Sequence, residues 1–281
     1  MNLLEQAKEL CRLYDIKPAR SKGQNFLVDE KIYDDIVAAA DLKPDDTVLE
    51  VGPGLGFLTA KLAKSAGRVI AVELDDKLAE ILKTGLAAKG VDNVEVVNSD
   101  VLETPLTPLL KGGNYKIVAN LPYNITSIFL RKFLSETKNK PKLSVLMLQK
   151  EVAERITAKP GKMSLLGVSA QCYAKPEIIQ IVEKENFWPE PQVGSAVVKI
   201  SLHPSPFLNK EKEKEFFRLV KFGFSAKRKM LKNNLAAGLK ISQADAENKI
   251  TKAGFNLKIR AQELSVDDWL KLCGEFRKNI V

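Results

Sequence analysis

Short apolar segments alternate with helical patterns along the chain from residue 47 onward. Five of these segments are rich in Val, Ile and Leu and have the length of buried strands: 47–51, 68–73, 94–98, 115–119 and 143–148. Between them, apolar residues recur at spacings of three and four over 57–67, 75–90 and 125–137, which predicts helices. Gly67 and Gly90 are typical helix stops. Strand–helix–strand repetition predicts right-handed crossovers and a parallel sheet with helices on both faces, so the expected fold class is α/β.

Two further predicted strands, 177–184 and 195–202, have no helical pattern between them and can pair antiparallel at one edge of the sheet. After them, in the last quarter of the chain, the pattern becomes purely helical. A proline-rich linker at 203–207 then precedes predicted helices at 210–224, 227–238, 242–254 and 265–276. Ser242 and Ser265 are predicted N-caps, because acidic residues follow each of them in the first turn. We therefore expect a first domain at 1–205 and a small all-helical domain at 206–281.

Most of the excess positive charge belongs to the predicted helical domain. The whole chain carries a net charge of +9, and residues 209–281 contribute 17 Lys and Arg against 9 Asp and Glu, a net +8. This asymmetry indicates a polyanionic partner. Nucleic acid is favoured over a membrane, because no strongly apolar amphipathic segment accompanies the charge. A solvated basic surface without a partner is the alternative interpretation.

Other compositional features narrow the class of protein. The apolar segment 143–148 is much shorter than the ~20 residues that a membrane span requires, and the N-terminus lacks the pattern of a secretory signal. The three cysteines, Cys11, Cys172 and Cys273, are too few and too far apart for a disulfide framework or a metal cluster. We expect a cytoplasmic protein that holds no metal and has no membrane partner.

Three glycines follow the first predicted strand, at Gly52, Gly54 and Gly56. Glycine at such a turn lets backbone N–H groups approach a ligand closely and directs the next helix N-terminus at it. The dinucleotide pattern G-x-G-x-x-G would require glycine at position 57, where the chain has Phe57. A nicotinamide cofactor is therefore disfavoured.

Acidic residues lie at the ends of the next two predicted strands. Glu73 can accept hydrogen bonds from both hydroxyls of a ribose, and Asp100 can accept from the amino group of an adenine. Each acid by itself could equally be a helix cap or an exposed carboxylate. In this order, however, a glycine turn, a ribose acid and an adenine acid outline an adenosine-containing ligand without a phosphate-binding lysine motif. S-adenosylmethionine fits this description.

The fourth predicted strand ends in "NLPYNI" (120–125), at the edge where substrates of α/β enzymes meet cofactors. The N6 amine of adenine is a poor nucleophile because its lone pair is delocalised into the ring. The side-chain oxygen of Asn120 and the main-chain oxygen of Leu121 can accept both N6–H bonds and so favour a tetrahedral nitrogen. Pro122 stiffens the turn, and Tyr123 can stack on a flipped-out base. Alone, this segment could be an ordinary turn; beside the glycine loop, it predicts adenine N6 methylation by in-line displacement.

Seven segments resemble signature blocks of the KsgA/RsmA family of small-subunit rRNA adenine N6,N6-dimethyltransferases, from one end of the chain to the other. They are "KGQNFLVD" (22–29), "VLEVGPGLGFLT" (48–59), "NLPYNI" (120–125), "QKEVAERI" (149–156), "SLLGVSAQ" (164–171), "FWPEPQVGSAVV" (187–198) and "FSAKRKMLKNNL" (224–235). The resemblance implies a Rossmann-like class I S-adenosylmethionine-dependent methyltransferase sheet. It also implies a cofactor-covering segment at 1–45 and a basic, rRNA-binding helical domain at the C-terminal end.

The resemblance further implies roles for individual residues. The residues expected to bind the cofactor, together with Gly54 of the glycine loop, are Asn25, Leu27, Gly52, Glu73, Asp100 and Asn120. Phe187 is expected to face Tyr123 across the target base, although the sequence alone would place it in a core. The residues expected to grip the rRNA backbone are Lys227, Arg228, Lys229 and Lys232. The sequence departs from the family pattern in two places: Gly194 replaces an aspartate, and Ser127-Ile128 replaces Thr-Pro.

The substrate implied by the resemblance is a pair of adjacent adenosines in the loop of the 3′-terminal hairpin of 16S rRNA, within a nearly mature 30S subunit. Each adenosine receives two methyl groups, so four S-adenosylmethionine molecules are used, and we expect a monomer. Two alternatives stay open. One is an antibiotic-resistance methyltransferase acting on an adenine of 23S rRNA, which shares the Asn-x-Pro-Tyr logic. The other is a non-catalytic RNA-binding assembly factor, against which the intact set of Glu73, Asp100, Asn120 and Tyr123 argues.

Overall fold

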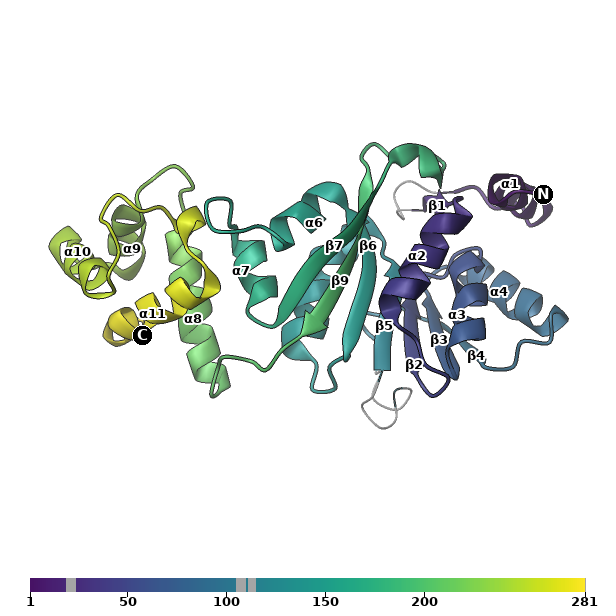
Figure 1. Cartoon of the computed structure of the whole chain (residues 1–281), viewed down its shortest axis with the longest axis horizontal. Coiled ribbons are helices and arrows are strands. Elements are labelled where there is room, and N and C mark those ends of the chain that lie inside the picture. The colour runs from purple at the N-terminus through teal and green to yellow at the C-terminus, as the bar shows by residue number, and fades with distance from the viewer. Residues whose placement is uncertain (19–23, 105–109, 111–114, 281) are drawn as a thin grey trace. The chain divides into compact units, whose positions relative to one another are not determined.

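The computed structural model describes residues 1–18, 24–104, 110 and 115–280. These residues form two compact units, one of 1–153 with 176–202 and the other of 154–175 with 203–281. The first unit contains a seven-stranded sheet in the order β4-β3-β2-β5-β6-β9-β7 (Figure 1). Its strands are β2 (Thr47–Val51), β3 (Arg68–Glu73), β4 (Val94–Asn98), β5 (Tyr115–Asn120), β6 (Leu143–Gln149), β7 (Ala174–Val182) and β9 (Ser195–Leu202). A separate two-stranded sheet pairs β1 (Phe26–Leu27) with β8 (Phe187–Trp188).

The parallel sheet that the sequence predicts is confirmed for its first five strands. Strands β2 to β6 pair in parallel, and β9 runs antiparallel to β6 next to the edge strand β7. The bounds of β2, β3, β4 and β9 match the apolar runs read from the sequence. Burial explains the agreement most clearly at β3, where residues 69–72 are all apolar and buried. The fold is the Rossmann-like class I methyltransferase arrangement.

The first unit also contains helices, several of which pack on the sheet. They are α1 (Leu3–Leu13), α2 (Glu30–Ala40), α3 (Phe57–Ser65), α4 (Asp76–Ala88) and α5 (Thr126–Arg131), with a π-helical turn at Lys132–Glu136. Helix α2 packs on β5, β6 and β9, while α4 packs on β3 and β4. Figure 1 shows α2 lying across the strands. The predicted helix 125–137 therefore contains a short 3₁₀ turn (Tyr123–Ile125), an α-helix and a π-turn in succession.

The second unit is helical, as predicted for residues after 206. Its elements are α7 (Leu165–Gln171), α8 (Lys210–Gly223), α9 (Leu231–Leu239), α10 (Gln243–Lys252) and α11 (Val266–Phe276), and the end of α6 (Lys150–Ile156) belongs to it. Ser242 and Ser265 are N-caps, because their side chains accept hydrogen bonds from the N–H groups of Asp245 and Asp268. Both residues therefore cap helices as the sequence predicts.

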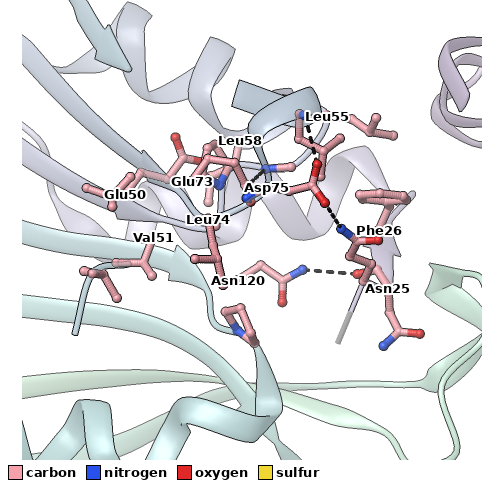
Figure 2. Close-up of a pocket in the computed structure, with 18 of the residues that line it drawn as sticks. Asn25, Phe26, Glu50, Val51, Leu55, Leu58, Glu73, Leu74, Asp75 and Asn120 are labelled. Atoms are coloured by element: carbon pink, nitrogen blue, oxygen red, sulfur yellow. Dashed lines mark hydrogen bonds between the residues drawn. The ribbon is translucent and has the colours of Figure 1, made fainter. Parts of the chain in front are cut away.

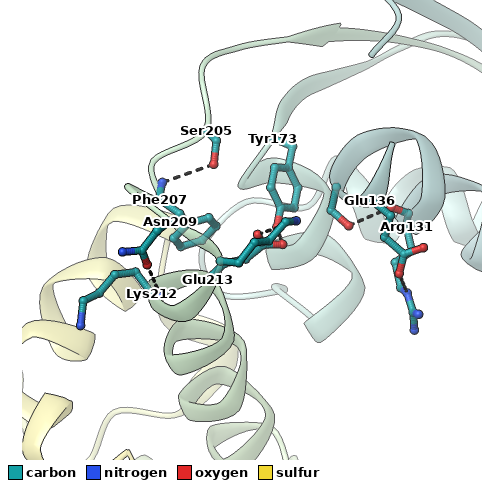
Figure 3. A network of polar contacts seen from close by, with 10 residues as sticks. Arg131, Glu136, Tyr173, Ser205, Phe207, Asn209, Lys212 and Glu213 are labelled. Carbon is teal, nitrogen blue, oxygen red and sulfur yellow. Dashed lines mark hydrogen bonds and ion pairs between the residues drawn. The ribbon is translucent and has the colours of Figure 1, made fainter. Parts of the chain in front are cut away.

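Residues 154–175 belong to the helical unit, whereas the sequence analysis placed them in the first domain. Tyr173 is the clearest physical reason. Its ring stacks on Phe217 at a centroid distance of 6.1 Å, and its hydroxyl donates to Glu213 of α8 at 2.7 Å (Figure 3). Nearby, the Asn209 side chain caps α8 by accepting from the Lys212 N–H at 2.9 Å (Figure 3). These contacts are long-range in sequence, so apolar periodicity could not reveal them.

Helix α9 begins at Leu231, four residues later than the predicted start at 227. Asn234 explains the difference. Its buried amide donates to the carbonyl oxygens of Gly223 (2.6 Å) and Ala226 (3.0 Å), which holds the preceding chain in a turn. The Leu231 N–H donates to the Ile259 carbonyl at 2.8 Å instead of to a preceding helical turn. Among the described residues, no helix is long and apolar enough to cross a membrane.

Candidate cofactor and substrate site

The glycine loop between β2 and α3 adopts a backbone that favours glycine. Gly52, Gly54 and Gly56 have φ angles of +66°, +56° and +82°, in the left-handed region. A Cβ atom at Gly54 would lie 3.2 Å from the Phe26 ring, and one at Gly52 would lie 3.5 Å from Pro122. The loop thus packs closely against β1 and the NLPYNI turn, and at its glycines it exposes backbone to the space above it.

Glu73 at the end of β3 fixes this loop. Its two carboxylate oxygens accept from the backbone N–H groups of Gly54 and Asp75, each at 3.0 Å. The side chain is 7% exposed, and burial raises the pKa of Glu73 while the backbone hydrogen bonds offset part of that rise. A carboxylate offers about four lone-pair positions. Glu73 can therefore hold the loop and still accept hydrogen bonds from ribose hydroxyls.

Asp100 follows β4 and has one carboxylate oxygen engaged in its own turn. That oxygen accepts from the Leu102 N–H at 2.8 Å, and the Asp100 carbonyl accepts from the Thr104 N–H at 2.8 Å. The second carboxylate oxygen is available to accept from an amino group. The turn thus orients the acid at the strand end where the sequence predicts an adenine partner.

Asn120 ends β5, and its amide is oriented by the N-terminal segment. The Asn120 Nδ2 donates to the Asn25 carbonyl oxygen at 3.5 Å, a long hydrogen bond (Figure 2). The amide oxygen then remains as an acceptor. The turn after Asn120 is anchored to the sheet, because the Leu121 N–H donates to the Met147 carbonyl at 3.2 Å. An acceptor at the end of β5 is thus held against the segment that precedes β1.

A cavity of about 220 Å³ lies over the carboxyl ends of β2, β3 and β5 (Figure 2). The residues that the sequence analysis assigned to the cofactor all line it: Asn25, Leu27, Gly52, Gly54, Glu73, Asp100 and Asn120. Pro122 of the predicted catalytic turn lines it as well. These residues come from distant parts of the chain and meet at one end of the sheet. The cradle is free of side chains at its glycines, and Glu73 and Asp100 border it, which fits an adenosine-containing cofactor.

Phe26 and Leu74 are among the apolar cavity residues that the sequence analysis did not single out. Phe26 packs against Gly54, and Leu74, directly after Glu73, keeps 65% of its surface exposed. An exposed leucine between two acids at a cavity mouth offers a flat apolar contact to a purine. Leu74 could have been found from its position at the strand end; Phe26 could not, because only the fold brings β1 to the glycine loop.

Glu50 is an acidic residue of the cavity that the sequence analysis did not single out. It lies on β2 beneath the cavity, is 1% exposed, and neither of its carboxylate oxygens has a well-formed hydrogen bond to any residue that the structure describes. Burial raises the pKa of Glu50 to about 8, a rise that the nearby Thr59 hydroxyl reduces and the Glu73 charge increases. In the sequence Glu50 is one residue of the predicted strand 47–51. Only its burial in the structure distinguishes it as a candidate functional residue.

Tyr123 and Phe187 lie outside the group of residues that line the cavity. Tyr123 is half-buried, and its hydroxyl is 2.6 Å from the hydroxyl of Ser195. Phe187 is 4% exposed and packs in a core cluster with Leu27, Tyr33 and Val182. The structure thus gives Phe187 the core position that the sequence alone suggested. Its role opposite Tyr123 across a base stays a prediction, which requires the ring to become accessible when RNA binds.

The four predicted RNA-binding residues fall into two groups. Lys227, Arg228 and Lys229 are exposed in the turn before α9. Lys232 is half-buried within α9, where its Nζ forms an ion pair with Glu247 at 2.7 Å. Only the first three therefore present free charge to a partner without breaking an ion pair, and we call them the basic turn (Lys227, Arg228 and Lys229).

Comparison with known proteins gives concordant results. The family model described as "Ribosomal RNA adenine dimethylase" matches residues 17–278. A protein named "Ribosomal RNA small subunit methyltransferase A" from Dehalococcoides mccartyi strain CBDB1 is 46% identical over 279 residues, which cover 99% of this chain and 95% of that protein. The solved structure of a dimethyladenosine transferase from Plasmodium falciparum is 31% identical with a TM-score of 0.74, covering 89% of this chain and 97% of that one. The solved 23S rRNA methyltransferase ErmE is 29% identical with a TM-score of 0.73, covering 90% and 100%.

Proposed function

Because this chain belongs to the ribosomal RNA adenine dimethylase family, we propose that it transfers methyl groups from S-adenosylmethionine to N6 of two adjacent adenosines in the 3′-terminal hairpin loop of 16S rRNA. Each adenosine becomes N6,N6-dimethyladenosine in the small ribosomal subunit. The observation that carries this proposal is the Asn120 amide at the cavity. Its nitrogen is engaged by the Asn25 carbonyl, so its oxygen is left to accept a hydrogen bond from the adenine amine.

The residues of the cavity divide the work between cofactor and substrate. S-adenosylmethionine, when bound, supplies a methyl group activated by its sulfonium. Glu73 accepts hydrogen bonds from the ribose hydroxyls, and Asp100 accepts one from the adenine amino group of the cofactor. The glycine loop admits the cofactor because its glycines place no Cβ atom in the cradle. This arrangement fixes the position of the methyl donor relative to the end of β5.

The NLPYNI turn binds the target adenine at the same edge of the sheet. The Asn120 side-chain oxygen and the Leu121 main-chain oxygen accept the N6–H bonds, which draws the nitrogen lone pair out of the ring and toward the methyl group. Tyr123 stacks on the base and so compensates for the stacking that the base loses when it leaves the RNA. Proton release needs no histidine, because the methylated amine is acidic enough to lose its proton to solvent. Catalysis is then mainly positioning.

The basic turn contacts rRNA phosphates and brings the enzyme to its site. Phosphate contacts position a protein without reading sequence and weaken with salt. The exposure of Lys227, Arg228 and Lys229 supports this role. A ribosomal substrate further implies that the enzyme works in the cytoplasm, and we propose that it does so as a monomer; equilibrium sedimentation of the purified protein tests the latter.

Methylation of 23S rRNA is the competing function, since ErmE resembles this chain in structure nearly as closely as the dimethyladenosine transferase does. The 46% identity to a small subunit methyltransferase over almost the whole chain favours 16S rRNA. The test is incubation with labelled S-adenosylmethionine and undermethylated small and large subunits, followed by nucleoside analysis. We expect N6,N6-dimethyladenosine in 16S rRNA alone. Label in 23S rRNA would select the competing function, and no label in either would favour a non-catalytic assembly factor.

A further inference from the structure

Tyr123 is connected to the sheet at a second point, far from the NLPYNI turn in sequence. Its hydroxyl is 2.6 Å from the hydroxyl of Ser195, a distance typical of a good O–H···O hydrogen bond. Ser195 has no exposed surface, whereas Tyr123 is half-buried. The hydrogen bond therefore joins a partly accessible ring to a fully buried side chain.

Ser195 is itself held rigidly. It is the first residue of β9 and pairs with Gln149 of β6. The carbonyl of the preceding residue, Gly194, accepts a hydrogen bond from the Lys150 N–H at 3.0 Å. Gly194 packs closely as well: a Cβ atom there would lie 3.2 Å from the Val182 carbonyl oxygen and 3.8 Å from the Glu183 carboxylate. The Ser195 hydroxyl thus occupies a fixed point at the end of the sheet.

The turn that carries Tyr123 is anchored to β6 through Leu121. The Leu121 N–H donates to Met147 of β6, two residues from the Gln149 position that pairs with Ser195. A tyrosine side chain has two rotatable bonds, and its hydroxyl lies on the axis of ring rotation. A hydrogen bond at the hydroxyl therefore fixes where the ring lies and leaves only rotation about its own axis. A base stacking on the ring would remove that remaining freedom.

We propose that Ser195 is a positioning residue, which holds the Tyr123 ring through the hydroxyl–hydroxyl hydrogen bond at the place where the target adenine stacks. This inference rests on the proposed role of Tyr123 as the stacking ring. The alternative is that the hydrogen bond only gives the buried Ser195 hydroxyl a partner, as buried polar groups generally require. In that case its loss would lower stability and leave the rate of methyl transfer unchanged. In the positioning role, its loss would lower the rate of methyl transfer.

A double-mutant cycle tests the proposal with full-length protein, labelled S-adenosylmethionine and undermethylated small subunits. Ser195→Ala and Tyr123→Phe each remove one hydroxyl and keep the stacking ring. We expect each to lower kcat about two- to tenfold, the effect of one neutral hydrogen bond, with little change in KM, since backbone contacts dominate RNA binding. The double variant should be no slower than Tyr123→Phe. Additive losses, or wild-type kcat in Ser195→Ala, would overturn the proposal.

Two controls keep the outcomes distinguishable. Ser144→Ala removes another buried serine of the same sheet, from β6, and should leave kcat unchanged. Tyr123→Ala removes the stacking ring itself. A Tyr123→Ala variant with normal activity would refute the proposed function of Tyr123, whereas an inactive one beside an unaffected Ser195→Ala would refute the positioning role alone. Thermal unfolding of every variant shows that the rates refer to folded protein.

Discussion

Asn120 carries the chemistry at the scale of single residues, because its amide is oriented from one side and open on the other. The hydrogen bond from its nitrogen to the Asn25 carbonyl decides which atom of the amide faces a substrate. A leucine, which has nearly the same shape but no oxygen, could not accept a hydrogen bond from the amine. The N-terminal segment thus influences the reaction by fixing the orientation of the Asn120 amide.

Asn120→Ala should therefore abolish methyl transfer and leave binding to small subunits intact, because the lost interaction is made to the reacting amine. Transfer of labelled methyl groups measures the first effect, and co-sedimentation with undermethylated subunits measures the second. Turnover at the wild-type rate would contradict the mechanism. Ser127→Ala, which changes an exposed serine of α5 that does not line the cavity, is the control and should retain most of the activity.

Glu73→Ala should weaken S-adenosylmethionine binding by about 1–3 kcal/mol, the usual effect of losing hydrogen bonds to a charged group. Part of the loss will come from the glycine loop, since the same carboxylate holds the Gly54 and Asp75 N–H groups. Isothermal titration calorimetry gives the dissociation constant. Glu80→Ala, an exposed acid on α4, should bind as the wild type does. Unchanged affinity in Glu73→Ala would remove the assigned role.

The raised pKa of Glu50 predicts that the stability of the protein falls as pH rises. Its pKa is about 8 in the folded protein against an ordinary value of 4.5, so between these values the folded state holds a proton that the unfolded state has lost. The free energy of unfolding should fall as pH rises from about 4.5 to 8, by at most about 1.4 kcal/mol per pH unit, and then level off. Melting temperatures of ligand-free protein measure this. Glu50→Gln should flatten the curve; an equally steep curve would assign the effect to other groups.

At the scale of elements, the turn before α9 depends on one buried amide. Asn234 donates to two carbonyl oxygens of the turn and is 3% exposed, so Asn234→Ala would leave both oxygens without this donor. We expect a loss of about 1–3 kcal/mol in the free energy of unfolding. Denaturant titration measures it, and Asn233→Ala, the exposed neighbour, should change stability by less than about 0.5 kcal/mol. Equal effects in the two variants would contradict this account.

The elements also show where sequence reasoning succeeds and where it fails. Strand β3 was predicted to the residue at 68–73, because its residues 69–72 are continuously apolar and buried. The edge strand at 94–98 was also predicted to the residue, from its three valines, although none of its residues is buried. The two-residue strands β1 and β8 were not predicted, since two residues carry no periodicity. Helix α9 was started too early, because the hydrogen bonds of Asn234 override a local helical pattern.

The cofactor side of the site was predictable for a similar reason. Glycines and acids at the ends of successive strands must meet at one edge of a parallel sheet, so Gly52, Glu73 and Asp100 could be grouped from the sequence. Glu50 could not, because a glutamate within a strand gives no indication of its burial. The pairing of Tyr123 with Ser195 could not either, since 72 residues separate them.

At the scale of the whole molecule, chemistry and charge belong to different units. The cavity is built entirely from residues of the first unit, whereas residues 209–281 of the second hold most of the net positive charge. Recognition of a large polyanion and activation of one amine can therefore be altered separately. A variant of the basic turn should change binding without changing the cavity.

Replacing Lys227, Arg228 and Lys229 together by glutamine should lower the affinity for small subunits. It should also reduce the slope of log affinity against log salt by about 2, close to 0.7 for each lost phosphate contact. Binding measured across a salt series tests this. Replacement of Lys240, Lys252 and Lys258, three exposed lysines of the same unit, should leave the slope closer to that of the wild type. An identical slope in the two triple variants would mean that the basic turn does not contact RNA.

The tight space around Gly194 has a consequence for protein engineering. Consensus design replaces a residue by the one that the family pattern implies, and the resemblance described in the sequence analysis implies aspartate at this position. In this chain the new Cβ would press on the Val182 carbonyl oxygen, and the added carboxylate would meet that of Glu183. A substitution chosen in this way would thus strain the strand start from which Ser195 reaches Tyr123, and an engineered version of this enzyme should retain its glycine there.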